Sequence, residues 1–184
     1  MAKEALLVID MLNDFVREGA PLEVPAAREV IPAIQREIEA ARRDGRPVVY
    51  VCDSHAPDDK EFTKFGWPPH AVKGTGGAKV IDELRPRTGD VIVEKTTYSG
   101  FYNTGLEGIL RELGVDRLRL TGCVTHICIL FTASDAVLRD YKITVPGDAV
   151  APLAREDHDA ALRIMKKVLG VKVILPSPVS SRVQ

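Results

Sequence analysis

Short apolar runs alternate with amphipathic segments along almost the whole chain, and this alternation constrains the fold more than any other feature. Runs such as ALLVI (5–9) and PVVYVC (47–52) have the length of buried strands, and the segments between the runs carry apolar residues at helical spacing. Such alternation predicts an α/β fold, with three α/β/α layers around a mainly parallel, six-stranded sheet. The expected strands are 5–9, 47–52, 90–94, 117–122, 142–147 and 171–175, and the expected helices are 26–45, 104–114, 126–141 and 155–170.

Length and composition fit one globular domain of 184 residues, of which 45% are hydrophobic and 28% charged. We expect that domain over residues 1–175, followed by a tail at 176–184. A net charge of −1 gives no indication of a nucleic-acid or membrane partner, and no apolar run reaches the roughly 18 residues that span a bilayer. Three cysteines argue against a disulfide framework, and the five-residue apolar stretch near the N-terminus is too short for a signal peptide, so we expect a cytoplasmic protein.

Side chains capable of chemistry follow the expected strands at their carboxyl ends. Asp10 follows the first strand, Asp53 the second and Lys95 the third, and the fourth strand runs directly into a stretch that contains Cys128. In a parallel sheet of this kind, ligands bind at the carboxyl ends of the strands. We therefore expect two acids, a lysine and a thiol to converge on one edge of the sheet.

Cys128 lies in the opening turn of the expected helix 126–141, where the helix N-terminus and a nearby Lys95 would lower the thiol pKa. Asp10 could take the thiol proton and return it to a leaving group, and backbone N–H groups could bind an oxyanion. These groups suffice for acyl transfer. The alternative is that Cys128 is a small buried hydrophobe, the role that we expect for Cys52.

The other cysteine and two histidines give weaker signals. Cys123 and Cys128 are separated by four residues, a spacing that matches neither common zinc motifs nor the redox C-x-x-C motif. His126 lies two residues from Cys128, and side chains at that spacing on a helix do not face each other. His158 is expected at the surface, because it lies in the charged start of a helix.

Residues 53–77 form a long segment without periodicity, and segments of this kind inside compact domains are often functional. The segment contains carboxylates and imidazoles, which suit a divalent transition metal such as zinc, manganese or iron, although histidines in a polar loop can equally be solvated. Trp67, the single tryptophan, could form a wall for a flat ligand. The candidate ligands are Asp53, His55 and His70, with Glu61, Asp58 and Asp59 as further candidates.

Taken together, these stretches resemble the isochorismatase-like cysteine hydrolases and, within them, the nicotinamidases (pyrazinamidases). VIDMLNDF is similar to the family's motif V-D-x-Q-N-D-F, with Asp10 in the place of the catalytic acid/base. EKTTYSGF resembles the lysine motif, with Lys95 in its place, and GCVTHIC matches G-[IVC]-[AV]-T-x-x-C, with Cys128 as the nucleophile. DSH followed by WPPH resembles the nicotinamidase metal motif. The resemblance extends to about residue 175 and implies a Rossmann-like, isochorismatase-like hydrolase fold.

The resemblance also implies an activity, the hydrolysis of nicotinamide to nicotinate and ammonia through a cysteine thioester. It implies a cis peptide bond before Val124, with the N–H groups of Val124 and Cys128 directed at the oxyanion. Aromatic residues at the positions of Phe15 and Trp67 would sandwich a pyridine ring, and Tyr98 would be a further pocket residue.

For cofactors and partners, the resemblance implies one divalent metal ion, zinc first and manganese or iron as alternatives. Asp53, His55 and His70 would be the ligands, with Glu61 as the fourth, and the ring nitrogen of the substrate would approach the metal. A small amide would be the substrate, and the chain would assemble into a homo-oligomer, a dimer or tetramer.

Some positions depart from the family pattern. The chain lacks the second histidine that many nicotinamidases have shortly after D-x-H, and it has Leu12 and His126 where the family often has glutamine and an acid. These departures leave open two alternatives: a metal-independent hydrolase of another small amide, such as a carbamoyl or ureido compound or biuret, and a non-catalytic metal-binding or thiol-sensing protein. Isochorismate hydrolysis is less favoured, because a vinyl ether does not need a thiol nucleophile.

Overall fold

The structure is a computed structural model that describes residues 3–175, so the expected tail at 176–184 lies outside the described residues. The strands are β1 (Glu4–Ile9), β2 (Val48–Asp53), β3 (Val91–Lys95), β4 (Arg117–Cys123), β5 (Lys142–Pro146), β6 (Val150–Ala151) and β7 (Lys172–Ile174). The α-helices are α1 (Asn13–Val16), α2 (Ile31–Arg43), α3 (Lys60–Phe65), α4 (Leu106–Glu112), α5 (Leu130–Val137) and α6 (Arg155–Lys167). Short 3₁₀ turns lie at Pro25–Ala27, Asp82–Leu84 and Gly147–Ala149, and a π-helical turn lies at Thr125–Ile129.

The strands form one sheet in the order β3-β2-β1-β4-β5-β7, with β6 paired to β4, and every pairing is parallel. The predicted fold class and its six strands are confirmed. The short β6 was not expected, because two residues are too few to leave a periodic pattern. The strand order reverses between β1 and β4, and a reversal of this kind is where open α/β sheets bind ligands.

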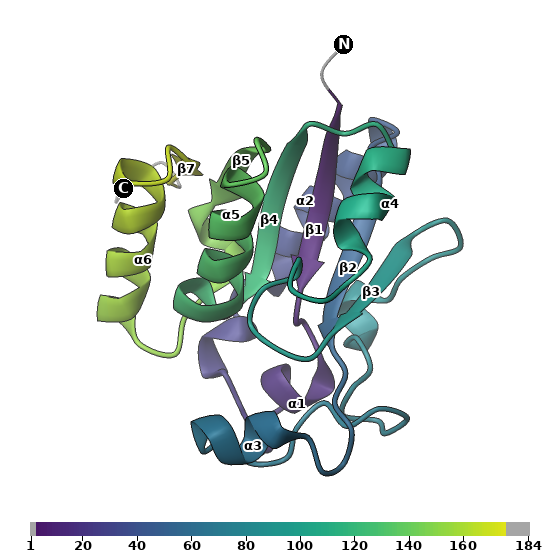
Figure 1. The fold of residues 1–184 in the computed structure, drawn as a ribbon, viewed down its shortest axis with the longest axis vertical. Helices are drawn as coiled ribbons and strands as arrows, with labels where there is room; N and C mark the ends of the chain where they lie inside the picture. The colour runs from purple at the N-terminus through teal and green to yellow at the C-terminus, as the bar shows by residue number, and fades with distance from the viewer. Residues whose placement is uncertain (1–2, 176–184) are drawn as a thin grey trace, which may run out of the picture.

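Helices cover both faces of the sheet, as Figure 1 shows, with α2 behind it and α4, α5 and α6 in front. The odd-numbered residues of β1 pack in one apolar cluster with α4, α5 and α6, and its even-numbered residues, Leu6 and Val8, pack in another with α2. Because both faces of β1 and β2 are buried, their sequences are continuous apolar runs. The carboxyl ends of these strands point toward α1 and α3 (Figure 1).

Three helical segments differ from the expectation. The expected helix 26–45 begins as α2 at Ile31, with Pro32 in its first turn, where a missing N–H costs no helical hydrogen bond. The segment 53–77 contains α3, which Asp59 caps by accepting a hydrogen bond from the Glu61 N–H at 2.9 Å. The expected helix 126–141 is divided between the π-helical turn and α5. Within residues 3–175, no helix combines the length and the apolar character that crossing a membrane requires.

The backbone at the switch point between β1 and β4 has three unusual features. Gly122 has a φ of +115°, and a Cβ added there would lie 1.9 Å from the carbonyl oxygen of Ile9, so only glycine fits between the two strands. Asp10 has a left-handed φ of +53° at the end of β1, and the Cys123 thiol donates a hydrogen bond to the Asp10 carbonyl oxygen at 3.2 Å. The expected cis peptide bond between Cys123 and Val124 is present.

Candidate active site

Four buried side chains from separate parts of the sequence meet at the switch point. Lys95, at the end of β3, places its Nζ 2.8 Å from Asp10 Oδ2 and 3.6 Å from the Sγ of Cys128. The same Nζ forms an ion pair with Asp53 at the end of β2. Each of these side chains is at most 9% exposed, so the convergence that the strand ends predicted is present and shielded from water.

Lys95 is the cation on which this cluster depends. Burial by itself would lower the pKa of Lys95, but the charges of Asp10 and Asp53 outweigh it and hold the pKa well above its usual value. Lys95 therefore stays charged and offsets the two carboxylates. A cation of this kind can also stabilise a thiolate that forms on Cys128.

The thiol of Cys128 corrects one expectation. A lowered pKa was expected, but burial raises the pKa of Cys128 well above its usual value, and the lowering effect of Lys95 does not overcome the combined effect of burial and the nearby carboxylates of Asp10 and Asp53. Cys128 lies in a π-helical turn rather than in a regular α-helical first turn. The free site therefore holds a neutral thiol, and a base must remove its proton before it can attack.

Asp10 has the position and the acidity of such a base. Its Oδ1 accepts a hydrogen bond from the Asp53 N–H at 2.8 Å, while Oδ2 lies beside Lys95. Burial, and after it the negative charge of Asp53, raise the pKa of Asp10 to about 6 against the opposing effect of Lys95. Asp10 and Cys128 line the same pocket, and each affects the pKa of the other, so Asp10 is placed to take the thiol proton.

A second cluster, next to Asp53, has the composition of a metal site. Ligand atoms of Asp53, His55 and His70 all lie within 4.8 Å of one another, and all three residues are buried. The Nε2 atoms of both histidines lie 3.8 Å from Asp53 Oδ2. The three ligands named from the sequence are therefore brought together.

The hydrogen bonds of the two histidines show that the cluster fits a metal ion. The Nδ1 of His55 lies 3.1 Å from Asp59 Oδ2, and the Nδ1 of His70 lies 2.7 Å from the carbonyl oxygen of Pro68. When Nδ1 donates its hydrogen to such a partner, Nε2 keeps its free electron pair for a metal ion, as in most histidine metal ligands. The Nε2 of His55 is buried without a hydrogen-bond partner, which an imidazole tolerates poorly unless a ligand supplies the contact.

The further candidate ligands have different positions. Asp59 caps α3 and binds His55 Nδ1, so it supports a ligand instead of being one in this geometry, and Asp58 is exposed. Glu61 is outside the three-residue cluster but is 8% exposed, and burial, followed by the charge of Asp53, raises its pKa to about 7. Its role as a fourth ligand stays a prediction.

A pocket of about 460 Å³, a volume that includes open solvent at its mouth, lies over both clusters. The aromatic residues expected to contact a substrate all line it, and the Trp67 Nε1–H donates a hydrogen bond to the Tyr98 hydroxyl at 3.4 Å. Val124 and Cys128, the expected oxyanion residues, line it as well. The full lining is Asp10, Phe15, Leu22, Val24, Asp53, Glu61, Trp67, His70, Tyr98, Cys123, Val124, Ile127, Cys128 and Leu153.

Some of these residues had no signal in the sequence. Leu22, Val24 and Leu153 lie in irregular or short segments, where no period marks them as pocket residues. Asp59 was named only as a candidate ligand, but its position four residues after His55 and directly before a short helix could have indicated its role as a helix cap and a partner of His55.

His126 and His158 both lie outside the pocket lining. His126 does not line the pocket, and its Nε2 lies 3.9 Å from Asp157, in agreement with the argument that it cannot face Cys128. The expectation for His158 was wrong: it is 8% exposed, and its Nδ1 lies 3.0 Å from the Thr125 hydroxyl, because α6 packs directly on the π-helical turn.

Comparisons with known proteins agree with this fold. The chain is 43% identical to the N-carbamoylsarcosine amidase of Thermoplasma acidophilum, with a TM-score of 0.86 over 97% of this chain and 99% of that one. It is 34% identical to a pyrazinamidase of Pyrococcus horikoshii solved in complex with zinc, with a TM-score of 0.88 over 95% and 99% of the two chains. It is also 37% identical to a probable inactive nicotinamidase of Arabidopsis thaliana, over 91% of this chain and 90% of that protein.

The match to a family is equally extensive. The isochorismatase domain matches residues 4–174, which include β1 to β7 and all the side chains of the two clusters. The chain therefore belongs to the isochorismatase family of hydrolases.

Proposed function

We propose that this hydrolase is a nicotinamidase, which converts nicotinamide to nicotinate and ammonia through a thioester on Cys128. The observation that carries the proposal is the position of the Lys95 Nζ, which lies 3.6 Å from Cys128 Sγ and 2.8 Å from Asp10 Oδ2, beside a buried cluster of two histidines and an aspartate. The first cluster supplies a nucleophile and a base for acyl transfer. The second supplies a place where the ring of an aromatic amide can be oriented.

The reaction begins with transfer of the thiol proton to Asp10. Its pKa of about 6 leaves the carboxylate ionised at neutral pH, while Lys95 stabilises the thiolate that forms. The sulfur of Cys128 then bonds to the carboxamide carbon, and the carbonyl electron pair moves to the oxygen. The backbone N–H groups of Val124 and Cys128, which border the pocket, would bind that oxyanion.

Collapse of the tetrahedral intermediate breaks the carbon–nitrogen bond. Asp10 returns its proton to the departing nitrogen, so that ammonia leaves and a thioester remains on Cys128. Asp10, again a carboxylate, then activates a water molecule, which adds to the thioester carbon. Expulsion of the Cys128 thiolate releases the carboxylic acid, which ionises to nicotinate, and Asp10 passes the proton that it took from water to the thiolate, which restores the starting state.

Asp53, His55 and His70 would hold a divalent metal ion, with zinc as the first candidate and manganese or iron as alternatives. When bound, this ion supplies a Lewis acid to which the pyridine nitrogen can be drawn. The protein contributes the aromatic residues Phe15 and Trp67 of the pocket lining, between which a flat ring would lie.

A second candidate substrate, an N-carbamoyl amino acid, is favoured by the 43% identity to N-carbamoylsarcosine amidase. Such a substrate carries a carboxylate, which binding sites usually hold with arginine or lysine. Among the described residues that line the pocket there is neither, and the lining includes the carboxyl groups of Asp10, Asp53 and Glu61. Lys95, the nearest cation, is already paired with two acids. The pocket therefore suits a neutral amide better.

An ammonia-release assay with zinc-loaded protein tests the proposal on nicotinamide, pyrazinamide, N-carbamoylsarcosine and biuret. We expect turnover of the two aromatic amides and little turnover of the others. Replacing Cys128 by alanine should abolish ammonia release, whereas Cys52→Ala should retain it, because Cys52 is buried outside the pocket lining. Preferred turnover of N-carbamoylsarcosine would favour the second candidate, and full activity of Cys128→Ala would refute the mechanism.

A further inference from the structure

A hydrogen bond joins α1, which carries the pocket residue Phe15, to the backbone next to the histidine His70. It runs from the backbone N–H of Ala71 to Oδ2 of Asp14, at 2.8 Å. Asp14 belongs to α1, where the next residue is Phe15, whose ring contacts the ring of His70 edge-on at 5.4 Å. Neither the proposed proton transfers nor the proposed metal ligands use Asp14, so its carboxylate needs another explanation.

Ala71 is connected to both histidine ligands. It follows His70 directly in sequence, and its carbonyl oxygen accepts a hydrogen bond from the backbone N–H of His55 at 3.0 Å. Ala71 is fully buried and has a left-handed φ of +46°, which is uncommon for a residue with a side chain. A conformation of this kind persists only when its surroundings hold it, and the bond to Asp14 fixes the N–H of this residue.

Gly77 provides the space that the Asp14 carboxylate occupies. A Cβ added at Gly77 would lie 2.1 Å from Oδ2 and 2.2 Å from Oδ1 of Asp14, much closer than atoms can approach. The carbonyl oxygen of Gly77 also accepts a hydrogen bond from the backbone N–H of Asp14 at 3.1 Å. A Cβ added at the adjacent Gly76 would have no atom within 4 Å, so Gly76 offers a matched control.

We propose that Asp14 is a positioning residue for the metal site: through Ala71 it holds the backbone of His55 and His70 in the arrangement that brings both Nε2 atoms to Asp53. The inference rests on the proposed metal binding and deepens it. Groups that orient metal ligands from outside typically change metal affinity by about 10- to 100-fold when they are removed. Asp14 acts on the backbone of Ala71, which follows one histidine ligand and is hydrogen-bonded to the other, whereas Asp59 acts on an imidazole ring.

The test measures zinc affinity directly, by titrating metal-free protein with Zn²⁺ against a chromophoric chelator. We expect Asp14→Ala and Gly77→Ala to weaken zinc binding by about 10- to 100-fold, the second because its new methyl group displaces the carboxylate. Asp14→Asn keeps an oxygen acceptor for the Ala71 N–H and should bind zinc within about threefold of wild type. Gly76→Ala should bind zinc like wild type.

Further readouts separate positioning from a general effect on folding. Circular dichroism of the metal-free variants should show the wild-type spectrum, and excess zinc should restore turnover of nicotinamide by Asp14→Ala with kcat near that of wild type. If Asp14→Ala does not fold, Gly77→Ala and Asp14→Asn still give the comparison. Wild-type zinc affinity in Gly77→Ala or in folded Asp14→Ala would overturn the inference.

The outcomes also distinguish this inference from the proposed reaction. If the wild-type protein binds zinc, the Asp14 and Gly77 variants bind it weakly, and none hydrolyses nicotinamide, the role of Asp14 stands and the proposed substrate fails. If the wild-type protein hydrolyses nicotinamide but binds no zinc, the role of Asp14 is overturned and the amidase activity stands.

Discussion

The carboxyl group of Asp10 lies between a cation and a second carboxylate, and their balance sets the pH at which the site can work. Burial and Asp53 raise its pKa to about 6 although Lys95 opposes them. Because a raised pKa means that the carboxyl is protonated below about pH 6, the base is lost on the acidic side and present at neutral pH. The nucleophile depends on this base, since the Cys128 thiol is neutral by itself.

We expect kcat/KM for nicotinamide to be level near neutral pH and to fall about tenfold per unit below about pH 6, as one essential base becomes protonated. The measurement is a pH–rate profile with excess zinc at every point, which keeps metal loss from contributing. Asp10→Asn should show no measurable turnover at any pH. A wild-type profile that stays level from about pH 8 to about pH 4.5 would contradict the assigned base.

Lys95 should also determine stability. Its replacement by methionine leaves the carboxylates of Asp10 and Asp53 buried and facing each other without a cation. Breaking a buried ion pair in this way costs about 3–5 kcal/mol of unfolding free energy, which urea denaturation of the metal-free protein measures. Lys166→Met, at an exposed position, should change it by less than about 0.5 kcal/mol. Equal stability of the two variants would show that the pairing contributes nothing.

At the scale of elements, the site depends on how closely β1 and β4 approach each other. Gly122 pairs with Ile9, and its missing side chain lets the end of β4 lie against β1, so that Asp10 and the turn with Cys128 meet. A methyl group there would meet backbone atoms, which cannot move aside as the end of a flexible side chain can. The two strands would have to separate at the point where the catalytic groups join.

Gly122→Ala should therefore fail to give folded, active protein, because its Cβ would lie 1.9 Å from a carbonyl oxygen at a φ of +115°. Gly108→Ala is the matched control: Gly108 lies in α4 with open space around it, and alanine should stabilise the helix by about 0.5–1 kcal/mol. Expression, circular dichroism and thermal unfolding compare the two. A folded Gly122→Ala variant with wild-type turnover would contradict this account of the strand contact.

The elements also show what the sequence could predict. Strands buried on both faces leave apolar runs, and their carboxyl ends share one edge, so Asp10, Lys95 and Cys128 could be placed together before any coordinates. Short elements such as α3 and β6 leave no period. The raised pKa of Cys128 could not be foreseen, because it depends on burial by distant segments. The partners of Asp14 lie 57 and 63 residues away, beyond the reach of local patterns.

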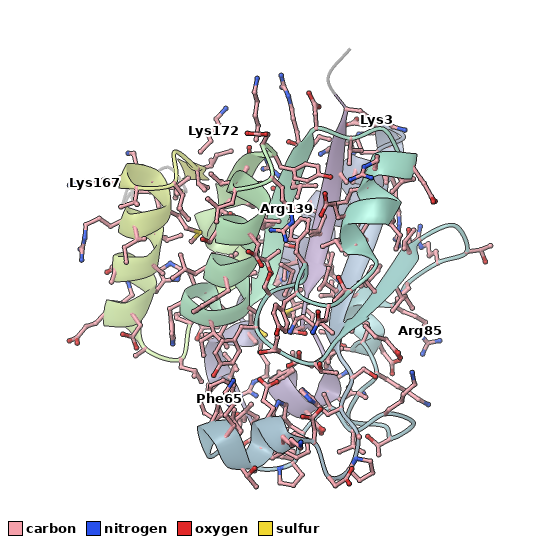
Figure 2. The ribbon with its side chains drawn as sticks, viewed as in Figure 1. Lys3, Phe65, Arg85, Arg139, Lys167 and Lys172 are labelled. Atoms are coloured by element: carbon pink, nitrogen blue, oxygen red, sulfur yellow. The ribbon has the colours of Figure 1, made fainter. Side chains whose placement is uncertain are left out.

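At the scale of the whole molecule, the site lies at one end of the sheet. In Figure 2, Phe65 lies on α3 at the end of the molecule toward which the strands point, whereas Lys3 and Lys172 lie at the opposite end. The segment with α3 crosses the carboxyl edge of the sheet between His55 and His70. A metal ion bound by these two histidines and Asp53 would therefore fasten the segment to the sheet.

Removal of the metal should lower the thermal stability of the whole protein. A ligand that binds only the folded state stabilises it by about 2.7 kcal/mol at a hundredfold excess over its dissociation constant. We expect the thermal unfolding midpoint to fall after chelation and to return to its original value when zinc is added. Scanning calorimetry measures both changes. His70→Asn should remove most of this difference, because one of the three ligands is lost. An identical midpoint with and without zinc would show that the cluster binds no zinc ion.

The stretch between His55 and His70 affects which molecules can enter the pocket. Residues 60–69 contain Glu61 and Trp67, which border the pocket, yet this stretch contributes no atom to the trio of acid, amine and sulfur that breaks the bond. Evolution, or a protein engineer, can therefore exchange residues 63–67, which leave out Glu61 and the Pro68 carbonyl that contacts His70, and change which molecules are admitted, while the reacting groups keep their places. Diversification of this lineage toward new compounds should concentrate its substitutions there.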